Sequence, residues 1–296
     1  MDVVISGSSG LIGTALVGAL QAAGHRPIRL VRRTPKGDEI AWDPTSGAID
    51  RDALEGADGV VHLAGAGIGD HRWTRAYKAE LVRSRTVATV VLAGALAQLD
   101  RKPSVLVSGS AIGYYGDRGD EQLTEASPPG RDFLADLCVA WESATVLAED
   151  AGVRVAHLRT GIVLSADGGA LKKQLPLFKL GLGGRFGKGD QWQSWISLAD
   201  EVGAILHLLT HELSGAVNAT APNPVTNADF AKALARQVHR PSFLPVPSFA
   251  PKLVLGGELA DSVLFGSQRV APTVLQASGY EFQHERLDAA LEAELG

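Results

Sequence analysis

The sequence predicts an α/β protein built on a doubly wound parallel sheet, with a smaller C-terminal substrate or cap domain. Apolar runs of strand length alternate with amphipathic helical segments through the first half of the 296 residues. The first such strand breaks into a glycine-rich turn that opens a helix. Beyond about residue 165 the alternation loosens. We therefore expect a large domain over 1–165, to which later elements return, and a smaller mixed α/β cap and C-terminal module over 166–296.

The first thirteen residues carry the most specific pattern. An apolar run over 3–5 is typical of a buried parallel strand, and Gly7-x-x-Gly10-x-x-Gly13 follows it directly. In this setting Gly7 permits a tight turn, Gly10 lets the backbone approach a pyrophosphate, and Gly13 lets the helix pack close to the strand. The free N–H groups at the start of the helix favour phosphate. The turn predicts a Rossmann-type dinucleotide site formed by Gly7, Ser8, Ser9, Gly10, Leu11, Ile12 and Gly13.

The second strand, expected over 27–31, indicates which dinucleotide is bound. It ends in Arg32 and Arg33, and the next acidic residue is Asp38. NAD-selective folds place a carboxylate here for the ribose 2′-hydroxyl, whereas a guanidinium suits a 2′-phosphate. NADP(H) is therefore favoured over NAD(H). The alternative for either arginine is a solvated surface charge.

The other elements follow from apolar periodicity and turn residues. A capping side chain at Thr226 precedes an apolar helical run, and 244–247, with two prolines, is expected to be a linker or edge segment. Further strands are expected over 59–65, 104–108 and 153–159, and helices over 74–99 and 133–150.

Composition excludes several classes of function. The hydrophobic content of 45% and charged content of 21% are those of an ordinary globular protein. The net charge of −5 argues against a nucleic-acid partner, and no apolar stretch is long enough to span a bilayer. The N-terminus enters the first strand directly, so we expect no signal peptide and a cytoplasmic protein. The single Cys138 excludes an internal disulfide, and no residue cluster has metal-site spacing.

Motifs along the chain resemble the extended short-chain dehydrogenase/reductase superfamily. They are the glycine turn, Leu63-Ala64-Gly65 and the segment 108–116. Further matches, among them Ser84-Arg85, Trp141-Glu142, Leu158-Arg159 and 221–227, resemble its atypical branch called "epimerase family protein", also labelled nucleoside-diphosphate-sugar epimerase or cell-division-inhibitor-like. The resemblance implies NADP(H) binding and a small-molecule substrate, which it does not identify. It also implies cofactor-proximal roles for Leu63, Ala64, Gly65, Glu80, Arg85, Ser108 and Val163.

One departure from the superfamily bears on catalysis. Its chemistry rests on a Tyr-x-x-x-Lys pair, and the corresponding positions here are Leu134 and Cys138, which cannot replace that pair. Ser110 matches the serine that polarises a substrate carbonyl, although it could also be a turn hydroxyl. Tyr114 or Tyr115 could bring a phenol to the cleft, and at least one of them is expected to be a packing residue.

Two other groups of polar residues are weighed in the same way. His62 lies inside an apolar run and is expected to be a core histidine. The loop 70–73 follows the third strand and could bind an acid or phosphate through His71 and Arg72, or could simply be an exposed charged loop. Two functions therefore remain open. One is an NADP(H)-dependent oxidoreductase or epimerase-like enzyme acting on a small carbonyl or sugar-like substrate. The other is a non-catalytic NADP(H)-binding sensor or scaffold.

Overall fold

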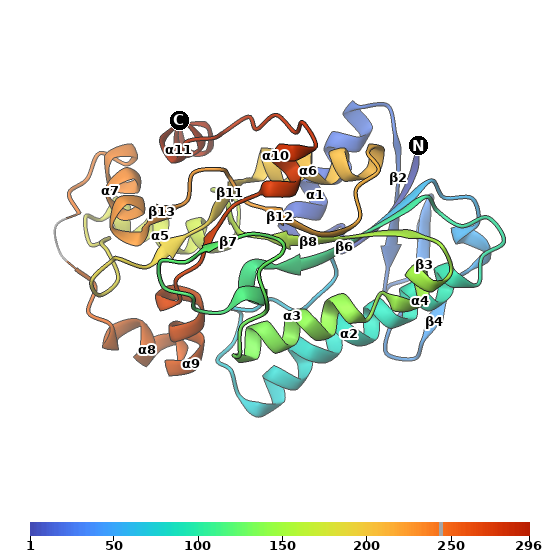
Figure 1. The fold of residues 1–296 in the computed structure, drawn as a ribbon, viewed down its shortest axis with the longest axis horizontal. Helices are drawn as coiled ribbons and strands as arrows, with labels where there is room; N and C mark the ends of the chain where they lie inside the picture. The colour runs from blue at the N-terminus through green and yellow to red at the C-terminus, as the bar shows by residue number, and fades with distance from the viewer. Residues whose placement is uncertain (243–244) are drawn as a thin grey trace.

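The protein is built around an eight-stranded sheet with helices on both faces (Figure 1). The computed structural model describes residues 1–242 and 245–296. The strand order is β12-β8-β6-β5-β1-β2-β3-β4, and all neighbours are parallel except β3 and β4. The strands are β1 (Asp2–Ser6), β2 (Arg26–Val31), β3 (Glu39–Asp43), β4 (Ala48–Ile49), β5 (Gly59–His62), β6 (Val105–Ala111), β8 (Arg154–Thr160) and β12 (Gly215–Ala219). The predicted fold class is confirmed.

Two layers of helices bury the two faces of the sheet. Helices α1 (Leu11–Ala22) and α6 (Leu198–Thr210) cover one face, while α2 (Arg75–Ala97), α3 (Phe133–Ser143) and α4 (Val146–Asp150) lie along the other (Figure 1). Successive residues of β1 alternate between the two layers, which explains why this strand is apolar throughout.

The direction in which strands are added reverses at β1. β2 pairs with one side of β1 and β5 with the other. In a doubly wound sheet the ligand crevice forms where this reversal occurs, outside the carboxyl ends of the strands. The glycine turn after β1 and the segments after β5 and β6 therefore lie around one expected crevice.

The predicted helix over 133–150 is wrong in one respect, because two helices occupy this range. The helical pattern breaks at Thr145, whose side-chain hydroxyl donates to the carbonyl of Glu142 at 2.7 Å. A threonine hydroxyl that bonds to nearby backbone offers an alternative to the helical ladder. This break lies immediately after Glu142, a residue of the candidate site described below.

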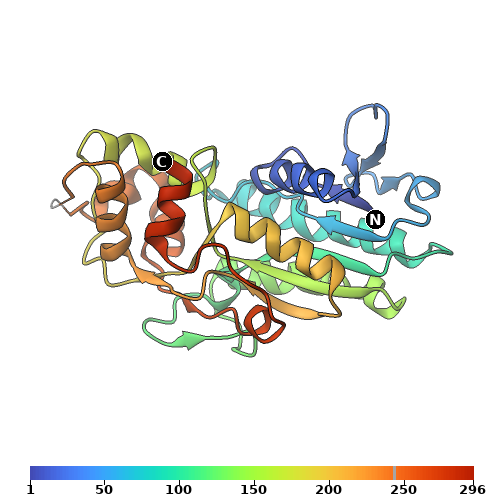
Figure 2. The same ribbon diagram turned by 90° about the horizontal axis from the view of Figure 1, so that it is seen from above.

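Most of the C-terminal helices gather at the end of the molecule opposite the N-terminus (Figure 2). They are α5 (Gly169–Lys179), α7 (Asn227–Gln237), α8 (Phe249–Leu255), α9 (Gly257–Ala260) and α11 (Leu287–Leu295), whereas α10 (Thr273–Ala277) packs beside β12 of the large sheet (Figure 1). Three two-stranded pairs accompany them, formed by β7 (Gln122–Leu123) with β14 (Arg269–Val270), β9 (Ile162–Leu164) with β11 (Trp195–Ser197), and β10 (Trp192–Gln193) with β13 (Val225–Thr226). Within the described residues, no helix is both long and apolar enough to cross a membrane.

Two predictions from the second half of the sequence can be followed in the structure. The Thr226 side chain accepts a hydrogen bond from the Asp229 amide, which confirms the predicted helix start. Of the predicted linker 244–247, Leu244 lies outside the described residues. Val246 forms an isolated β-bridge with Phe186. β12 and α6 lie beyond residue 165 and return to the large sheet.

Candidate functional site

The glycine turn after β1 is built by close backbone contacts. Gly7 has φ +71°, and a Cβ there would lie 2.7 Å from the carbonyl carbon of Leu63. A Cβ on Gly13 would lie 2.3 Å from the Gly7 oxygen. Gly10 differs from both, because its φ of −77° suits any residue and its Cβ would meet only the Gly7 oxygen, at 3.4 Å. Gly7 and Gly13 are thus required by the turn itself, whereas Gly10 borders free space.

The N-terminus of α1 is left open to a ligand. No side chain caps the helix at Gly10, and its first turn contains no acidic residue. Ser8 is buried, and its carbonyl accepts a hydrogen bond from Thr14 Oγ1, while Ser9 is exposed. The helix dipole and the free N–H groups of such a terminus attract a phosphate. This cradle of backbone fits the pyrophosphate of a dinucleotide.

Leu11 closes one side of this turn. A Cβ on Gly168 would lie 3.1 Å from its methyl carbons, so the segment before α5 packs directly on the first residue of α1. Ile12 and Val163 are half-buried and pack against the same core cluster. These side chains therefore form apolar walls beside the open helix terminus.

The two arginines after β2 are not equivalent. The Arg33 guanidinium binds both carboxylate oxygens of Glu39, at 2.7 and 2.5 Å, and this ion pair is exposed on its arginine side. The Arg32 side chain is exposed, and no ion pair is recorded for it with any described residue. Arg32 therefore offers the freer guanidinium for a 2′-phosphate. The pairing of Arg33 with Glu39 cannot be read from the sequence, because it depends on the contact between β2 and β3 in the folded chain.

Arg85 of α2 lies against the segment that follows β5. Arg85 is 8% exposed, and its guanidinium donates to the Ala66 carbonyl at 2.9 Å, next to Gly65. Glu80, five residues earlier on α2, is half-buried and pairs with Arg83 at 2.5 Å. Ala64 lies against Gly7, because a Cβ on Gly7 would lie 2.9 Å from the Ala64 nitrogen. Arg85 and the segment 63–65 thus border the glycine turn.

The positions of the usual tyrosine–lysine pair contain no acid–base group. Leu134 and Cys138 on α3 both face Gly113, whose Cβ would lie 3.3 Å from Leu134 Cβ and 3.8 Å from Cys138 Sγ. Burial raises the pKa of the Cys138 thiol to about 12, so it stays protonated near neutral pH. Neither residue can exchange a proton with a substrate at that pH.

Ser110 belongs to a buried ionic network at the end of β6. Its hydroxyl donates to Glu142 Oε1 at 2.7 Å. Arg159 on β8 binds the same carboxylate through Nε and Nη2, at 2.8 and 2.9 Å. Only 12% of the Glu142 side chain and 4% of the Arg159 side chain are exposed. A bidentate pair of this kind fixes the carboxylate and, through it, the orientation of the serine hydroxyl.

The two tyrosines are held by the same network. The Tyr115 hydroxyl donates to Asn218 Oδ1 at 2.7 Å and accepts from Arg159 at 2.9 Å, and its side chain is fully buried. Burial raises the pKa of this phenol, and the nearby Arg159 charge only partly opposes the shift. Tyr114 is partly buried, and its ring lies 3.4 Å from the Arg159 guanidinium carbon. Of the three predicted catalytic residues, Ser110 and Tyr115 are thus engaged in buried hydrogen bonds, whereas Tyr114 is the most exposed.

His62 on β5 and Ser108 on β6 are buried polar residues of the sheet. His62 bonds to Ser6 at 2.6 Å and Thr89 at 3.0 Å, and burial lowers its pKa to about 4, as expected of a neutral core histidine. Ser108 is fully buried, and its hydroxyl has no hydrogen-bond partner in the described part of the chain. Ser108 thus lies inside the sheet, two residues before Ser110.

The loop 70–73 contacts the C-terminal helices. Arg72 donates to the carbonyls of Leu253 and, at 3.0 Å, Val254 at the end of α8. Asp70 lies 3.8 Å from Lys173 of α5. The Arg72 guanidinium thus joins this loop to α8 through two of its nitrogens, which favours the alternative that the loop is a charged surface segment over binding of an acid or phosphate. The cation beside the rings of Tyr114 and Tyr115 is Arg159.

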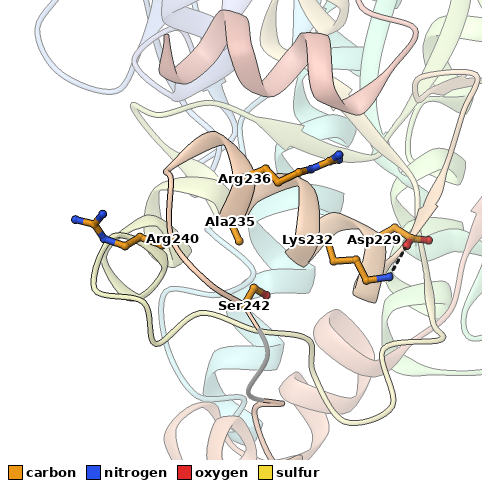
Figure 3. Close-up of a pocket in the computed structure, with 6 residues that line it drawn as sticks. All are labelled: Asp229, Lys232, Ala235, Arg236, Arg240 and Ser242. Atoms are coloured by element: carbon orange, nitrogen blue, oxygen red, sulfur yellow. Dashed lines mark hydrogen bonds and ion pairs between the residues drawn. The ribbon is translucent and has the colours of Figure 1, made fainter.

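A hollow of about 520 Å³ on α7 is separate from these residues (Figure 3). Its lining includes Lys232, Arg236 and Arg240, but each cation already has a partner: Asp229, Asp288 and the Lys179 carbonyl, respectively. In Figure 3 the Arg236 and Arg240 side chains point away from each other. The hollow therefore has no converging charges for an anion.

Comparisons with known proteins agree with this geometry. The sequence model of the NAD dependent epimerase/dehydratase family matches residues 3–220, from β1 to the end of β12. This chain belongs to that family. A domain of unknown function, DUF1731, matches residues 246–294 of this family member. The resemblance inferred from its motifs is thereby confirmed.

Several relatives of this epimerase/dehydratase family member match it nearly end to end. An epimerase family protein of Mycobacterium tuberculosis is 47% identical over 291 residues, covering 98% of this chain and 96% of that protein. Human epimerase family protein SDR39U1 is 36% identical over 295 residues, or 98% of each chain.

Solved structures extend the agreement to the fold. The crystal structure of human SDR39U1 with NADPH matches with a TM-score of 0.92 and 34% identity, over 100% of this chain and 99% of that chain. A nucleoside-diphosphate sugar epimerase from Corynebacterium glutamicum matches with a TM-score of 0.83 and 40% identity, over 100% of this chain and 58% of that chain.

Sequence reasoning missed Glu142 and Arg159 as members of the site. Both residues stood in motifs that carry the family resemblance, but their side chains had no assigned role. The position of Arg159 in the sequence could have indicated this pair. Arg159 lies at the end of the apolar run of β8, and a guanidinium buried there needs a carboxylate partner.

Proposed function

We propose that the protein is an NADP(H)-dependent oxidoreductase or epimerase-like enzyme that acts on a small carbonyl or sugar-like substrate. The observation that carries the proposal is the combination of an open, glycine-built helix terminus at β1 with the Ser110–Glu142 hydrogen bond of 2.7 Å at β6. The crystal structure of human SDR39U1 with NADPH supports the same cofactor. In hydride chemistry the cofactor supplies the hydride, and the protein supplies binding and orientation.

Different parts of NADP(H) bind to residues that follow different strands of the sheet. The amides of Leu11, Ile12 and Gly13 bind the pyrophosphate, and Arg32 binds the 2′-phosphate at the β2 side. The nicotinamide end then lies on the other side of β1, towards β5 and β6. When bound, NADP(H) supplies or accepts the hydride.

Ser110 orients the substrate oxygen. Its proton points at Glu142, so its own oxygen is free to accept a hydrogen bond from a substrate hydroxyl. Arg159 keeps the Glu142 carboxylate in place through its bidentate pair. With a carbonyl substrate, the Ser110 hydroxyl turns from Glu142 and donates to the carbonyl oxygen.

The alternative is a non-catalytic NADP(H)-binding sensor or scaffold. Leu134 and Cys138 favour this alternative, because they replace the acid–base pair while the cofactor turn is retained. The two functions differ in turnover and not in cofactor binding.

The deciding experiment measures turnover and binding on the same preparations. Purified protein is mixed with NADPH and a panel of aldehydes, ketones and nucleotide sugars, and with NADP⁺ and the corresponding alcohols. We expect slow turnover that falls roughly 100-fold in Ser110→Ala, as for loss of one positioned hydrogen-bond donor to a reacting oxygen. Ser143→Ala, an exposed serine on α3, is the matched control and should behave like wild type. Tight NADPH binding without turnover of any compound would support the sensor.

A further inference from the structure

Two segments in the C-terminal part of the chain contain no acidic residue. They are residues 168–189, which include α5, and residues 230–257, which include α8 and most of α7. Nine of the 28 lysines and arginines lie in these segments, and none of the 33 aspartates and glutamates does. The net charge of the whole chain is −5. Positive charge is therefore concentrated in two stretches of an otherwise acidic protein.

Hydrogen bonds hold these two segments side by side. Arg240 Nε donates to the Lys179 carbonyl at 2.9 Å, and the Val246 amide donates to the Arg185 carbonyl at 2.8 Å. Both segments lie at the end of the molecule opposite the N-terminus (Figure 2). They therefore form one surface, made of residues 172–188, 240–242 and 245–254, which we call the basic surface.

Five cations of the basic surface have no carboxylate partner. They are the exposed side chains of Lys172, Lys179, Arg185, Lys188 and Arg240. Among the residues that the structure describes, no acidic side chain forms an ion pair with any of these five, whereas Lys173 and Lys252 pair with Asp70 and Asp261 at 3.8 and 2.6 Å. The charge of the five is not neutralised locally, so it attracts an anionic partner from outside the chain.

The basic surface also carries the six most exposed large apolar side chains of the described chain. They are Leu177, Leu180, Leu182, Phe249, Leu253 and Val254, with exposed fractions of 50–74%. The next in order is Val146 of α4, at 47%. An apolar area of this kind, surrounded by charged residues, is typical of a protein or membrane contact site.

The helices α5 and α8 of the basic surface border the same loop, residues 69–72. Lys173 of α5 donates to the Gly69 carbonyl at 3.0 Å, and Arg72 donates to the Val254 carbonyl of α8 at 3.0 Å. No side chain of α8 is buried. The apolar side chains of α8 therefore extend the exposed apolar area that begins on α5.

We propose that the basic surface binds anionic phospholipid at the surface of a membrane. Its lysines and arginines bind the headgroup phosphates, while the leucines and Phe249 enter the boundary between headgroups and acyl chains. Helices that lie in a membrane interface combine these two features, cations on the polar side and Leu or Phe on the other. Duplex nucleic acid would attract the same cations but would leave the exposed leucines in water.

Co-sedimentation of the full chain with lipid vesicles tests this binding. One set of vesicles contains phosphatidylcholine alone, and the other contains an equimolar mixture of phosphatidylcholine and phosphatidylglycerol. We expect the chain to bind the mixed vesicles only. The affinity should fall at least about 10-fold as the ionic strength rises from about 0.01 M to about 1 M, because the Debye length then shortens from about 30 Å to about 3 Å.

Two double variants separate the charged from the apolar contribution. The variant with Lys179→Glu and Lys188→Glu should bind the mixed vesicles more than about 25-fold more weakly, since each basic residue near such a surface contributes about a factor of five. The variant with Leu180→Ser and Leu182→Ser should lose about 10-fold or more, because two apolar side chains no longer enter the interface.

The matched controls change other exposed residues in the same way. Lys36→Glu with Lys102→Glu alters the net charge equally, and Val87→Ser with Val90→Ser removes two exposed valines of α2. Neither control should lower the affinity by more than about threefold, because distant charges are screened. All of these positions are exposed, so thermal unfolding should stay close to wild type. If a double variant misfolds, its two single variants decide.

Several outcomes overturn the proposal. Equal binding of wild type to both kinds of vesicle, or to neither, does so, as does wild-type affinity in either double variant of the basic surface. If wild type self-associates without lipid in sedimentation velocity and Leu180→Ser with Leu182→Ser restores a monomer, the surface joins two copies of the chain instead. If labelled duplex DNA binds more tightly than the mixed vesicles and Lys179→Glu with Lys188→Glu abolishes that binding, the partner is a nucleic acid. None of these measurements involves NADP(H), so they stand apart from the proposed function.

Discussion

The carboxyl group of Glu201 is fully buried at the start of α6, where its Oε1 accepts a hydrogen bond from Thr160 Oγ1 at 2.7 Å. Its other oxygen has no partner within the described residues. Burial raises the pKa of this carboxyl from 4.5 to about 8, so the folded protein holds it protonated at neutral pH.

This shift predicts that Glu201→Gln stabilises the protein in a pH-dependent way. In the unfolded chain Glu201 ionises above pH 4.5, whereas in the folded chain it stays protonated up to about pH 8. The free-energy cost of burying this carboxyl therefore grows by about 1.4 kcal/mol per pH unit as pH rises from 4.5 to 8. Above pH 8 the cost stays constant. Urea unfolding at about pH 5 and about pH 9 should show a gain of several kcal/mol for Glu201→Gln only at the higher pH.

The control for this prediction is Glu212→Gln. The Glu212 side chain is 96% exposed, so its replacement should change the free energy of unfolding by less than about 0.5 kcal/mol at either pH. An equal gain at both pH values for Glu201→Gln would show that the gain does not come from titration of this carboxyl.

Gly10→Val and Gly13→Ala should have different consequences. At Gly10 the backbone is extended and the Cβ has room, so the variant should fold and lose NADPH binding because the side chain occupies the pyrophosphate position. At Gly13 even a methyl group would overlap the Gly7 carbonyl oxygen, so the variant should unfold at a lower temperature. Circular dichroism melting and NADPH titration check both. A folded Gly10→Val that binds NADPH normally would contradict the assignment of this turn.

The preference for NADPH over NADH should depend more on Arg32 than on Arg33. Replacing both arginines by alanine should remove most of the preference, because a charged hydrogen bond is worth about 1.5–3 kcal/mol. Arg32→Ala alone should have the larger effect, since Arg33 is already paired with Glu39. Arg26→Ala, at the start of β2 and paired with Asp2, is the control. Equal affinity of wild type for the two cofactors would refute this prediction.

Tyr115→Phe should act mainly on stability. The change leaves Asn218 Oδ1 and an N–H of Arg159 without their hydrogen-bond partner in a buried site. An unsatisfied buried polar group costs about 1–3 kcal/mol, so the free energy of unfolding in urea should fall by that amount. Tyr114→Phe, which keeps the ring that packs on Arg159, should cost less than about 0.5 kcal/mol. If Tyr115→Phe is as stable as wild type, this network is not intact in solution.

The sequence by itself determined the architecture and the cofactor turn. Strand and helix positions followed from apolar periodicity, which reflects burial of both faces of β1 and its neighbours. The spacing of Gly7, Gly10 and Gly13 is a local backbone requirement, so it is legible without the rest of the molecule. The missing acid–base pair at Leu134 and Cys138 was likewise visible in the sequence, because that pair lies on one helix.

Only the tertiary structure decided which charged side chains meet. Ser110, Glu142 and Arg159 are 17 to 49 positions apart in the chain. They come together because β6 and β8 are neighbouring strands and α3 packs against β6. The pairing of Arg33 with Glu39 and the burial of Arg85 near Cys138 also depend on neighbouring elements. Ion pairs and hydrogen bonds act over a few ångströms in space, whereas sequence patterns report only the spacing along one strand or helix.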